Sequence, residues 1–157
     1  MKVVSDTSPI CYLALIGELD LLPALYERVH IPEAVAAELK HPSAPAILRS
    51  WVESSPACLE ILKVRQRDSS GMERLQMGER EAIFLAEDLG ASLLIVDDRR
   101  AREVALMRGL EITGLLGLLG EAAKRKLVYL PDVFERLQRT SFRTTPGFLK
   151  ALLEKHP

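Results

Sequence analysis

The sequence predicts an α/β fold: a three-layer α/β/α sandwich around a central, mainly parallel sheet of about five short strands. Two observations support this fold class. Short apolar runs that suit buried strands alternate along the chain with longer segments whose apolar residues recur at helical spacing. Most of the predicted strands are also joined through a predicted helix, and such connections give parallel strands with helices on both faces of the sheet.

The length and composition are those of one folded domain. The chain has 157 residues, of which 48% are hydrophobic and 27% charged, enough to bury a core. We therefore expect a single domain over residues 1–157, with C-terminal helices from about 131–157 packed on it. The net charge of −1 excludes nucleic-acid binding by bulk charge alone.

The charge is unevenly distributed between two parts of the chain. Residues 1–96 carry 9 basic and 14 acidic side chains, whereas residues 97–157 carry 12 basic and 8 acidic ones. A local basic face beside an acidic pocket fits this imbalance, and so do solvated helix faces. We expect a cytoplasmic protein, because the N-terminus lacks a signal-peptide pattern and no apolar run approaches the roughly 18 residues of a membrane span. Cys11 and Cys58 form no CxxC pair, and we expect buried free thiols.

The first predicted elements are a strand and a helix. Residues 3–4 form a short strand that ends at Asp6, and Ser8 is expected to cap a helix whose first residue is Pro9. Gly17 ends this helix. Its buried face is expected to contain Cys11, Leu13, Leu15 and Ile16.

The alternation of strands and helices continues to the C-terminus. Further strands are expected at 29–31, 59–62, 93–96 and 110–112. Further helices are expected within 19–29, 32–40, 47–52, 78–90, 99–108 and 115–126, with two more within 131–156. The polar segment 63–78 is expected to be a mobile loop.

Acidic residues follow two of the predicted strands. Asp6 ends the first strand, and Asp97 and Asp98 end the strand at 93–96. Ligands of a parallel sheet bind outside the carboxyl ends of its strands. If these two strands are neighbours, their carboxylates open into one crevice.

Two further acids come from helices. Glu38 lies near a helix C-terminus, where the dipole disfavours negative charge, and it borders an apolar face; the alternative is an ordinary exposed glutamate. Glu79 stands at a helix start, where capping is the alternative role. Glu81, two residues on, cannot lie on the same helix face as Glu79. We favour Glu79 for the crevice because the residues four and seven positions after it are apolar and lie on its face of the helix.

A set of carboxylates from separate segments suits a hard divalent cation. Mg²⁺ and Mn²⁺ take oxygen ligands, and such an ion activates water and stabilises phosphoryl charge. The three histidines are scattered, and the chain has no phosphate-binding loop pattern. Arg99, Arg100 and Arg102 are candidates to hold substrate phosphates or to pair with the carboxylates, although a solvated first turn also explains at least two of them.

Four segments of the chain resemble a known protein family. The segments "SDTSP", "IPEAVAAEL", "GEREAIFLAEDLGASLLIVDDRRAREVA" and "GLEITGLLGLLGEAAKRKLV" are similar, in this order, to PIN-domain proteins. The likeness is strongest to the subgroup related to toxin ribonucleases of prokaryotic toxin–antitoxin modules. It implies an acidic pocket that binds Mg²⁺ or Mn²⁺, hydrolysis of RNA phosphodiesters, a homodimer and inhibition by a cognate antitoxin.

The resemblance assigns the site residues one by one. The family's first acid falls on Asp6, with the hydroxyl of Ser8 in its supporting place, the second on Glu38 and the third on Glu79. The fourth falls on Asp97 or Asp98. These acids are the expected catalytic set, and the metal ligands are expected among Asp6, Glu79, Asp97 and Asp98.

Two departures from the family pattern stand out. The third acid is often an aspartate in relatives, and many carry Thr or Ser two residues before the fourth acid, where this chain has Ile95 or, in the other register, Val96. We therefore expect a metal-dependent endoribonuclease and toxin, with a catalytically weak PIN-fold module that binds RNA or protein as the alternative. A phosphate-handling domain of receiver or dehalogenase type is disfavoured, because neither pattern of acids is matched.

Overall fold

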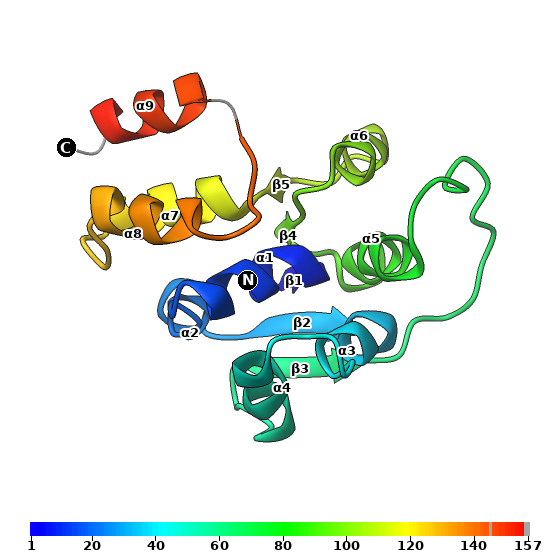
Figure 1. Ribbon diagram of the computed structural model, residues 1–157. Helices are drawn as coiled ribbons and strands as arrows, with labels where there is room; N and C mark the ends of the chain where they lie inside the picture. Colours follow the sequence, from blue (N-terminus) through cyan, green and yellow to red (C-terminus); the bar gives the residue numbers. More distant parts are fainter. Residues whose placement is uncertain (145, 156–157) are drawn as a thin grey trace.

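The central layer of the molecule is a five-stranded parallel sheet. A computed structural model of the protein describes residues 1–144 and 146–155 (Figure 1). The strands are β1 (Val3–Ser5), β2 (Val29–Pro32), β3 (Leu59–Leu62), β4 (Leu93–Ile95) and β5 (Ile112–Thr113). Their order in the sheet is β3-β2-β1-β4-β5, and all four neighbouring pairs are parallel. The predicted fold class is confirmed.

Helices connect and flank these strands. In the described part of the chain they are α1 (Thr7–Leu15), α2 (Leu21–Tyr26), α3 (Glu33–Leu39), α4 (Ala46–Glu53), α5 (Met77–Leu89), α6 (Arg99–Met107), α7 (Leu115–Lys124), α8 (Leu130–Gln138) and α9 (Pro146–Lys155). Most of their ends agree with the predicted ranges to about two residues. None of the described helices has the length and apolarity needed to cross a membrane.

Alternating side chains of the strands build two cores. Val3 and Ile95 join a cluster with α1, α2, α3, α4, α7 and α8, whereas Val4 and Leu94 join a second cluster with α5 and α6. Successive strand residues point to opposite faces, so the sheet is the middle of three layers. At one edge α8 packs on α7, and α9 lies against α8 (Figure 1).

Helix α1 starts earlier than predicted. Asp6, not Ser8, is its N-cap residue, and Pro9 is the third helical residue. Proline is tolerated there because the first turn's N–H groups have no acceptor within the helix. Cys11 is only half-buried and Leu15 is 46% exposed, so the prediction that both lie in the core is wrong; Leu13 and Ile16 are buried as predicted.

Three other predictions need correction or qualification. Cys58 is a free thiol but is half-buried rather than buried. The last strand lies at Ile112–Thr113, slightly after its predicted range. Residues 63–76 form neither helix nor strand, as predicted, but Met72 and Leu75 are buried against the second core, and Arg67 pairs with Asp88 at 2.5 Å.

Candidate active site

The junction of β1 and α1 places Asp6 at the edge of the sheet. β1 pairs with β4 in the register Ser5 to Ile95, and the Asp6 N–H continues this ladder by donating to the carbonyl of Ile95 at 2.9 Å. The chain then turns directly into α1. The two strands are neighbours, and Asp6 is only 4% exposed, so a carboxylate is held at the carboxyl ends of the central strands.

A cleft of about 300 Å³ opens beside Asp6. Glu38 from α3 and Glu79 from α5 line it together with Asp6, and Thr7 and Ser8 contribute hydroxyl groups from the first turn of α1. We call this the acidic cleft. It brings together three of the sequence-predicted acids and the predicted supporting serine.

Glu38 is fixed in the cleft by two neighbours. The Thr7 hydroxyl donates to its Oε2 at 2.5 Å. On the other side Gly78 lies so close that a Cβ atom there would overlap Glu38 Oε1. Glu38 is half-buried, so it is not the ordinary exposed glutamate of the alternative interpretation.

Glu79 has both of the roles that the sequence left open. It lines the acidic cleft, and its Oε1 accepts from the Gln76 N–H at 2.9 Å in the capping box that begins α5. Glu81 instead accepts from the Ala34 N–H at 3.2 Å, at the start of α3. The two glutamates therefore face different neighbours, as the spacing of two residues requires.

The electrostatics of the acidic cleft are those of carboxylates without a counter-ion. Burial, and then the charges of Glu79, Glu38 and Asp98, raise the pKa of Asp6 to about 7, although the Thr7 N–H opposes the shift. Burial and the neighbouring acids also raise the pKa of Glu79. Among the described residues, no ion pair involves Asp6, Glu38 or Glu79. The cleft therefore favours a cation.

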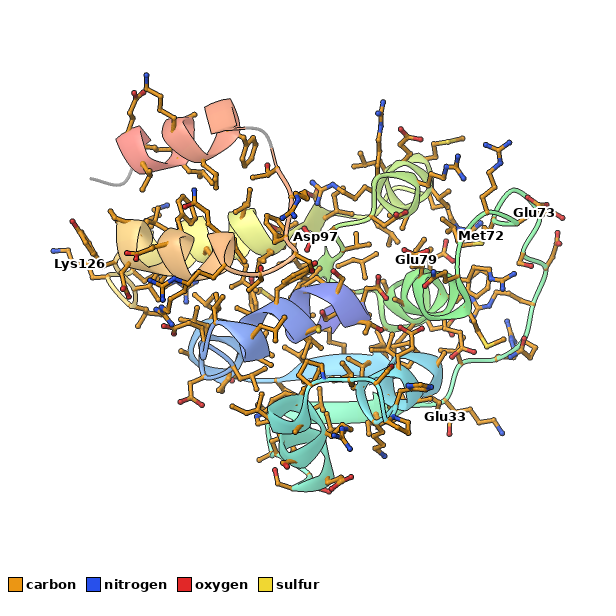
Figure 2. The ribbon with its side chains drawn as sticks, viewed as in Figure 1. Glu33, Met72, Glu73, Glu79, Asp97 and Lys126 are labelled. Atoms are coloured by element: carbon orange, nitrogen blue, oxygen red, sulfur yellow. The ribbon has the colours of Figure 1, made fainter. Side chains whose placement is uncertain are left out.

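Asp97 and Asp98, at the end of β4, bind different neighbours. Asp98 caps α6 by accepting from the Ala101 N–H at 3.0 Å, and its charge acts on both Asp6 and Glu79. Asp97 accepts from the Leu115 N–H at 3.0 Å, at the start of α7. Figure 2 shows Glu79 on α5 and Asp97 beside the start of α7. The structure thus places Asp98, and not Asp97, with the other acids.

The three arginines after this pair do not line the acidic cleft. Arg99 and Arg100 are exposed, and Arg99 pairs with Glu103 one turn on at 3.3 Å. Arg102 donates to the carbonyl of Val96 at 2.7 Å and lines a different cleft. Of the four predicted substrate-binding residues, only Ser8 lies in the acidic cleft.

Sequence reasoning missed part of the lining of the acidic cleft. The missed residues are Thr7, Cys11, Tyr12, Leu15, Gln76 and Ser141. Gln76 three residues before Glu79 was a readable capping signal, and Thr7 adjoins Asp6. Ser141 carries no such signal, because it reaches the cleft through the packing of the C-terminal segment, where it hydrogen-bonds Tyr12 at 2.9 Å between the two hydroxyls.

The chemistry of the acidic cleft fits a divalent metal, although no cage is preformed. Within residues 1–144 and 146–155, no three His, Cys, Asp or Glu side chains converge closely enough to hold an ion. The donors are nevertheless all oxygen atoms, as Mg²⁺ and Mn²⁺ prefer. Burial and then the mutual repulsion of the acids raise the pKa of Asp6, and a cation that binds such carboxylates relieves the repulsion.

Comparison with known proteins identifies the family. A family model described as PIN domain matches residues 2–157, almost the whole chain. No curated protein matches the sequence. PIN domains are in general nucleases, and their nucleases typically use divalent metals. The parallel sheet, the order of the acids along the chain and the family match agree, and the chain belongs to the PIN-domain family.

Proposed function

We propose that the protein is a metal-dependent endoribonuclease that hydrolyses RNA phosphodiester bonds. The observation that carries the proposal is the acidic cleft, in which Asp6, Glu38 and Glu79 meet without a cationic partner in the described chain. Membership of the PIN-domain family supports nuclease chemistry in general. The choice of RNA rests on the resemblance to toxin ribonucleases.

The carboxylates have distinct roles in this proposal. Asp6, Glu79 and Asp98 would hold Mg²⁺ or Mn²⁺, and Glu38, oriented by the Thr7 hydroxyl, would bind the metal or position the attacking water. A bound ion of this kind lowers the pKa of water and stabilises charge on phosphoryl oxygens. Ser8, which lines the same cleft from the first turn of α1, would support Asp6, a role that rests on the resemblance.

The direct test is cleavage of end-labelled total RNA and of purified tRNA with Mn²⁺, Mg²⁺ or EDTA. Cutting should need metal, and Asp6→Asn should slow it about 100-fold or more, the scale of losing a metal-site group. Cutting that persists in EDTA, or that survives Asp6→Asn, would contradict the proposal.

Two glutamates on α5 provide a matched control. Glu79→Gln removes a charge from the acidic cleft, whereas Glu81→Gln removes one from the start of α3, two residues along the same helix. Both replacements keep an acceptor oxygen for the N–H that each side chain binds. Cleavage should fall with Glu79→Gln and persist with Glu81→Gln; equal losses would show that the acidic cleft is not the site.

One observation favours a catalytically weak binding module as the second candidate. Val96 occupies the place, two residues before Asp98, where many relatives carry a hydroxyl, and its side chain is buried in the second core. It therefore supplies no polar group to the fourth acid. Well-folded protein that binds RNA but neither cuts it nor binds Mn²⁺ in a calorimeter would support this candidate over the nuclease.

We also propose that the nuclease is a toxin that a cognate antitoxin inhibits, and that it acts as a homodimer. Both statements rest on the resemblance. Induced expression in a bacterial host should arrest growth and deplete an RNA, and Asp6→Asn made at the same level should do neither. Arrest by both forms would separate toxicity from the acidic cleft. Light scattering of the purified chain tests the dimer.

A further inference from the structure

A second cleft lies at the carboxyl ends of β4 and β5. Its volume is about 390 Å³, slightly larger than that of the acidic cleft. Arg102 and Arg143 line it together with Phe142 and Phe148, so it combines basic and aromatic side chains. We call it the basic cleft. Asp97, labelled in Figure 2 beside the start of α7, also lines it.

The two arginines are free to bind an anion. Arg102 donates from Nη1 to the carbonyl of Val96, and Arg143 donates from Nη1 to the carbonyls of Thr140 and Phe142. Neither forms an ion pair within the described residues. Each guanidinium therefore keeps N–H groups for a ligand, and their planar arrangement suits phosphate oxygens.

Asp97 offsets part of the charge of Arg102, but it forms no ion pair with either arginine within the described residues. Its Oδ1 accepts from the Leu115 N–H, and its Oδ2 is buried. Gly114 covers it so closely that a Cβ atom there would lie 2.5 Å from Asp97 Oδ1 and 2.9 Å from Arg102 Nη1. Asp97 therefore positions the start of α7 and lies behind Arg102.

The aromatic side chains offer a surface for a base. Phe148 on α9 is 52% exposed although it is a large apolar residue. Phe142 is half-buried, and its ring packs edge-on against Tyr12 with centroids 5.2 Å apart. Stacking on an exposed ring is the usual way in which proteins bind unpaired bases. A guanidinium and an aromatic ring in one cleft match the two parts of a nucleotide.

The basic cleft and the acidic cleft are lined by neighbouring residues of the C-terminal segment. Ser141 lines the acidic cleft, whereas Phe142 and Arg143, the next two residues, line the basic cleft. At the end of β4, Asp98 acts on the acids and Asp97 lies in the basic cleft. Consecutive residues thus line different clefts at Ser141 and Phe142.

We propose that the basic cleft binds a nucleotide of single-stranded RNA next to the phosphodiester held in the acidic cleft. Arg102 and Arg143 contact its phosphate, and its base stacks on Phe148. This proposal rests on the proposed function for its choice of RNA, and it assigns substrate binding to residues outside the family's acids. A duplex is excluded from the basic cleft, because its bases are already stacked on one another.

The test is binding rather than cleavage, and EDTA keeps the RNA intact. Fluorescence anisotropy of a labelled single-stranded oligoribonucleotide gives Kd for the full chain and its variants. Phe148→Ala should weaken binding about 5- to 100-fold, the range for loss of one stacked base. Phe148→Tyr keeps an aromatic ring and should bind like the wild type. Arg143→Gln should weaken binding and lower the salt dependence by the contribution of about one phosphate contact.

Matched controls come from nearby or similar residues outside the basic cleft. Arg139→Gln removes an exposed arginine that pairs with Glu135 on α8, and Tyr129→Ala removes an exposed aromatic ring that lies before α8. Neither should change Kd. A thermal melt followed by circular dichroism checks that each variant is folded.

The outcomes separate this proposal from the nuclease proposal. If Phe148→Ala and Arg143→Gln weaken binding but the protein never cuts RNA, the basic-cleft proposal is supported and the nuclease proposal is rejected. If the protein cuts RNA with metal but both variants have an unchanged Kd, the nuclease proposal is supported and the basic-cleft proposal is rejected. Equal competition by duplex RNA would also overturn it, since the proposed stacking needs unpaired bases.

Discussion

Two buried carboxylates at the ends of neighbouring strands have opposite surroundings. Asp6 ends β1 and Asp97 follows β4, and burial is the largest cause that raises the pKa of both. Around Asp6 the next neighbours include three acids that raise its pKa further. Around Asp97 the Leu115 N–H and the charge of Arg102 oppose the shift. The charge of the neighbours, rather than burial, distinguishes a site for a cation from a structural contact.

The largest expected effect is a gain of stability on removing the charge of Asp6. Its pKa is about 7 in the folded chain against an ordinary 3.8, so between these values the folded state binds a proton that the unfolded state has released. Stability therefore falls as pH rises from 4 to 7. Asp6→Asn should stabilise the protein by up to about 4 kcal/mol at pH 8, at roughly 1.4 kcal/mol per pKa unit.

Urea unfolding of both forms at pH 4 and pH 8 measures this difference. The gain should be small at pH 4, where wild-type Asp6 is protonated in the folded state. A variant that is equally or less stable than the wild type at pH 8 would show that Asp6 has a compensating partner. Such a result would remove the contrast with Asp97.

Metal should reduce the difference in stability between the wild type and Asp6→Asn. Mn²⁺ at 100 times its Kd should stabilise the wild type by about 2.7 kcal/mol, because binding to the folded state alone shifts the unfolding equilibrium. Asp6→Asn should gain much less, whereas Asp97→Asn should gain as much as the wild type. Differential scanning calorimetry with Mn²⁺ and with EDTA gives the shift in Tm. Equal shifts for Asp6→Asn and the wild type would argue against the acidic cleft as the metal site.

Substitution of the glycines that contact Asp97 and Glu38 tests the comparison between the two sites in another way. Gly114→Ala should displace Asp97 and cost about 1–3 kcal/mol, since the Leu115 N–H loses its acceptor. Gly78→Ala should displace Glu38 and lower Mn²⁺ affinity by about 10-fold. Gly147→Ala in α9, where the added methyl meets open space, is the control: it should leave Mn²⁺ affinity unchanged and should not destabilise the protein, since Ala favours a helix more than Gly. Urea unfolding and calorimetric titration with Mn²⁺ measure them.

The smallest expected effect separates the two roles of Asp98. Asp98→Ala should cost about 1 kcal/mol, because α6 loses the acceptor of the Ala101 N–H. Asp98→Asn keeps an acceptor and should cost little, but it removes a charge that acts on Asp6 and should lower Mn²⁺ affinity. Equal Mn²⁺ affinity in Asp98→Asn and the wild type would return the fourth position to Asp97.

Much of this fold was predictable because its signals are local. The β4 strand is a short apolar run, and Gly90 and Gly109 end their helices with positive φ angles of 58° and 80°. Asp6 and Glu79 were also found from local signals, the end of a strand and the start of a helix. The start of α1 was misplaced because Ser8 and Pro9 form a good capping pattern, whereas the turn at Asp6 is set by pairing with Ile95.

The rest depended on contacts between distant segments. To choose between Asp97 and Asp98, one must know on which side of β4 each side chain lies. A shift of one residue in that strand reverses the answer. Leu15 was expected in the core from its spacing, but it lines the acidic cleft, where the core gives way to solvent. Ser141 and the basic cleft depend on the C-terminal segment, which no local pattern positions.

The contact between Tyr12 and Ser141 has a consequence for the order in which the protein is made. The two residues are 129 positions apart, so one wall of the acidic cleft joins helix α1 to a segment that the ribosome synthesises much later than α1. Domains fold as their chain emerges, and contacts of such long range form late. A nascent chain thus carries an incomplete cleft, beside ribosomal and messenger RNA, until the segment around Ser141 has been synthesised.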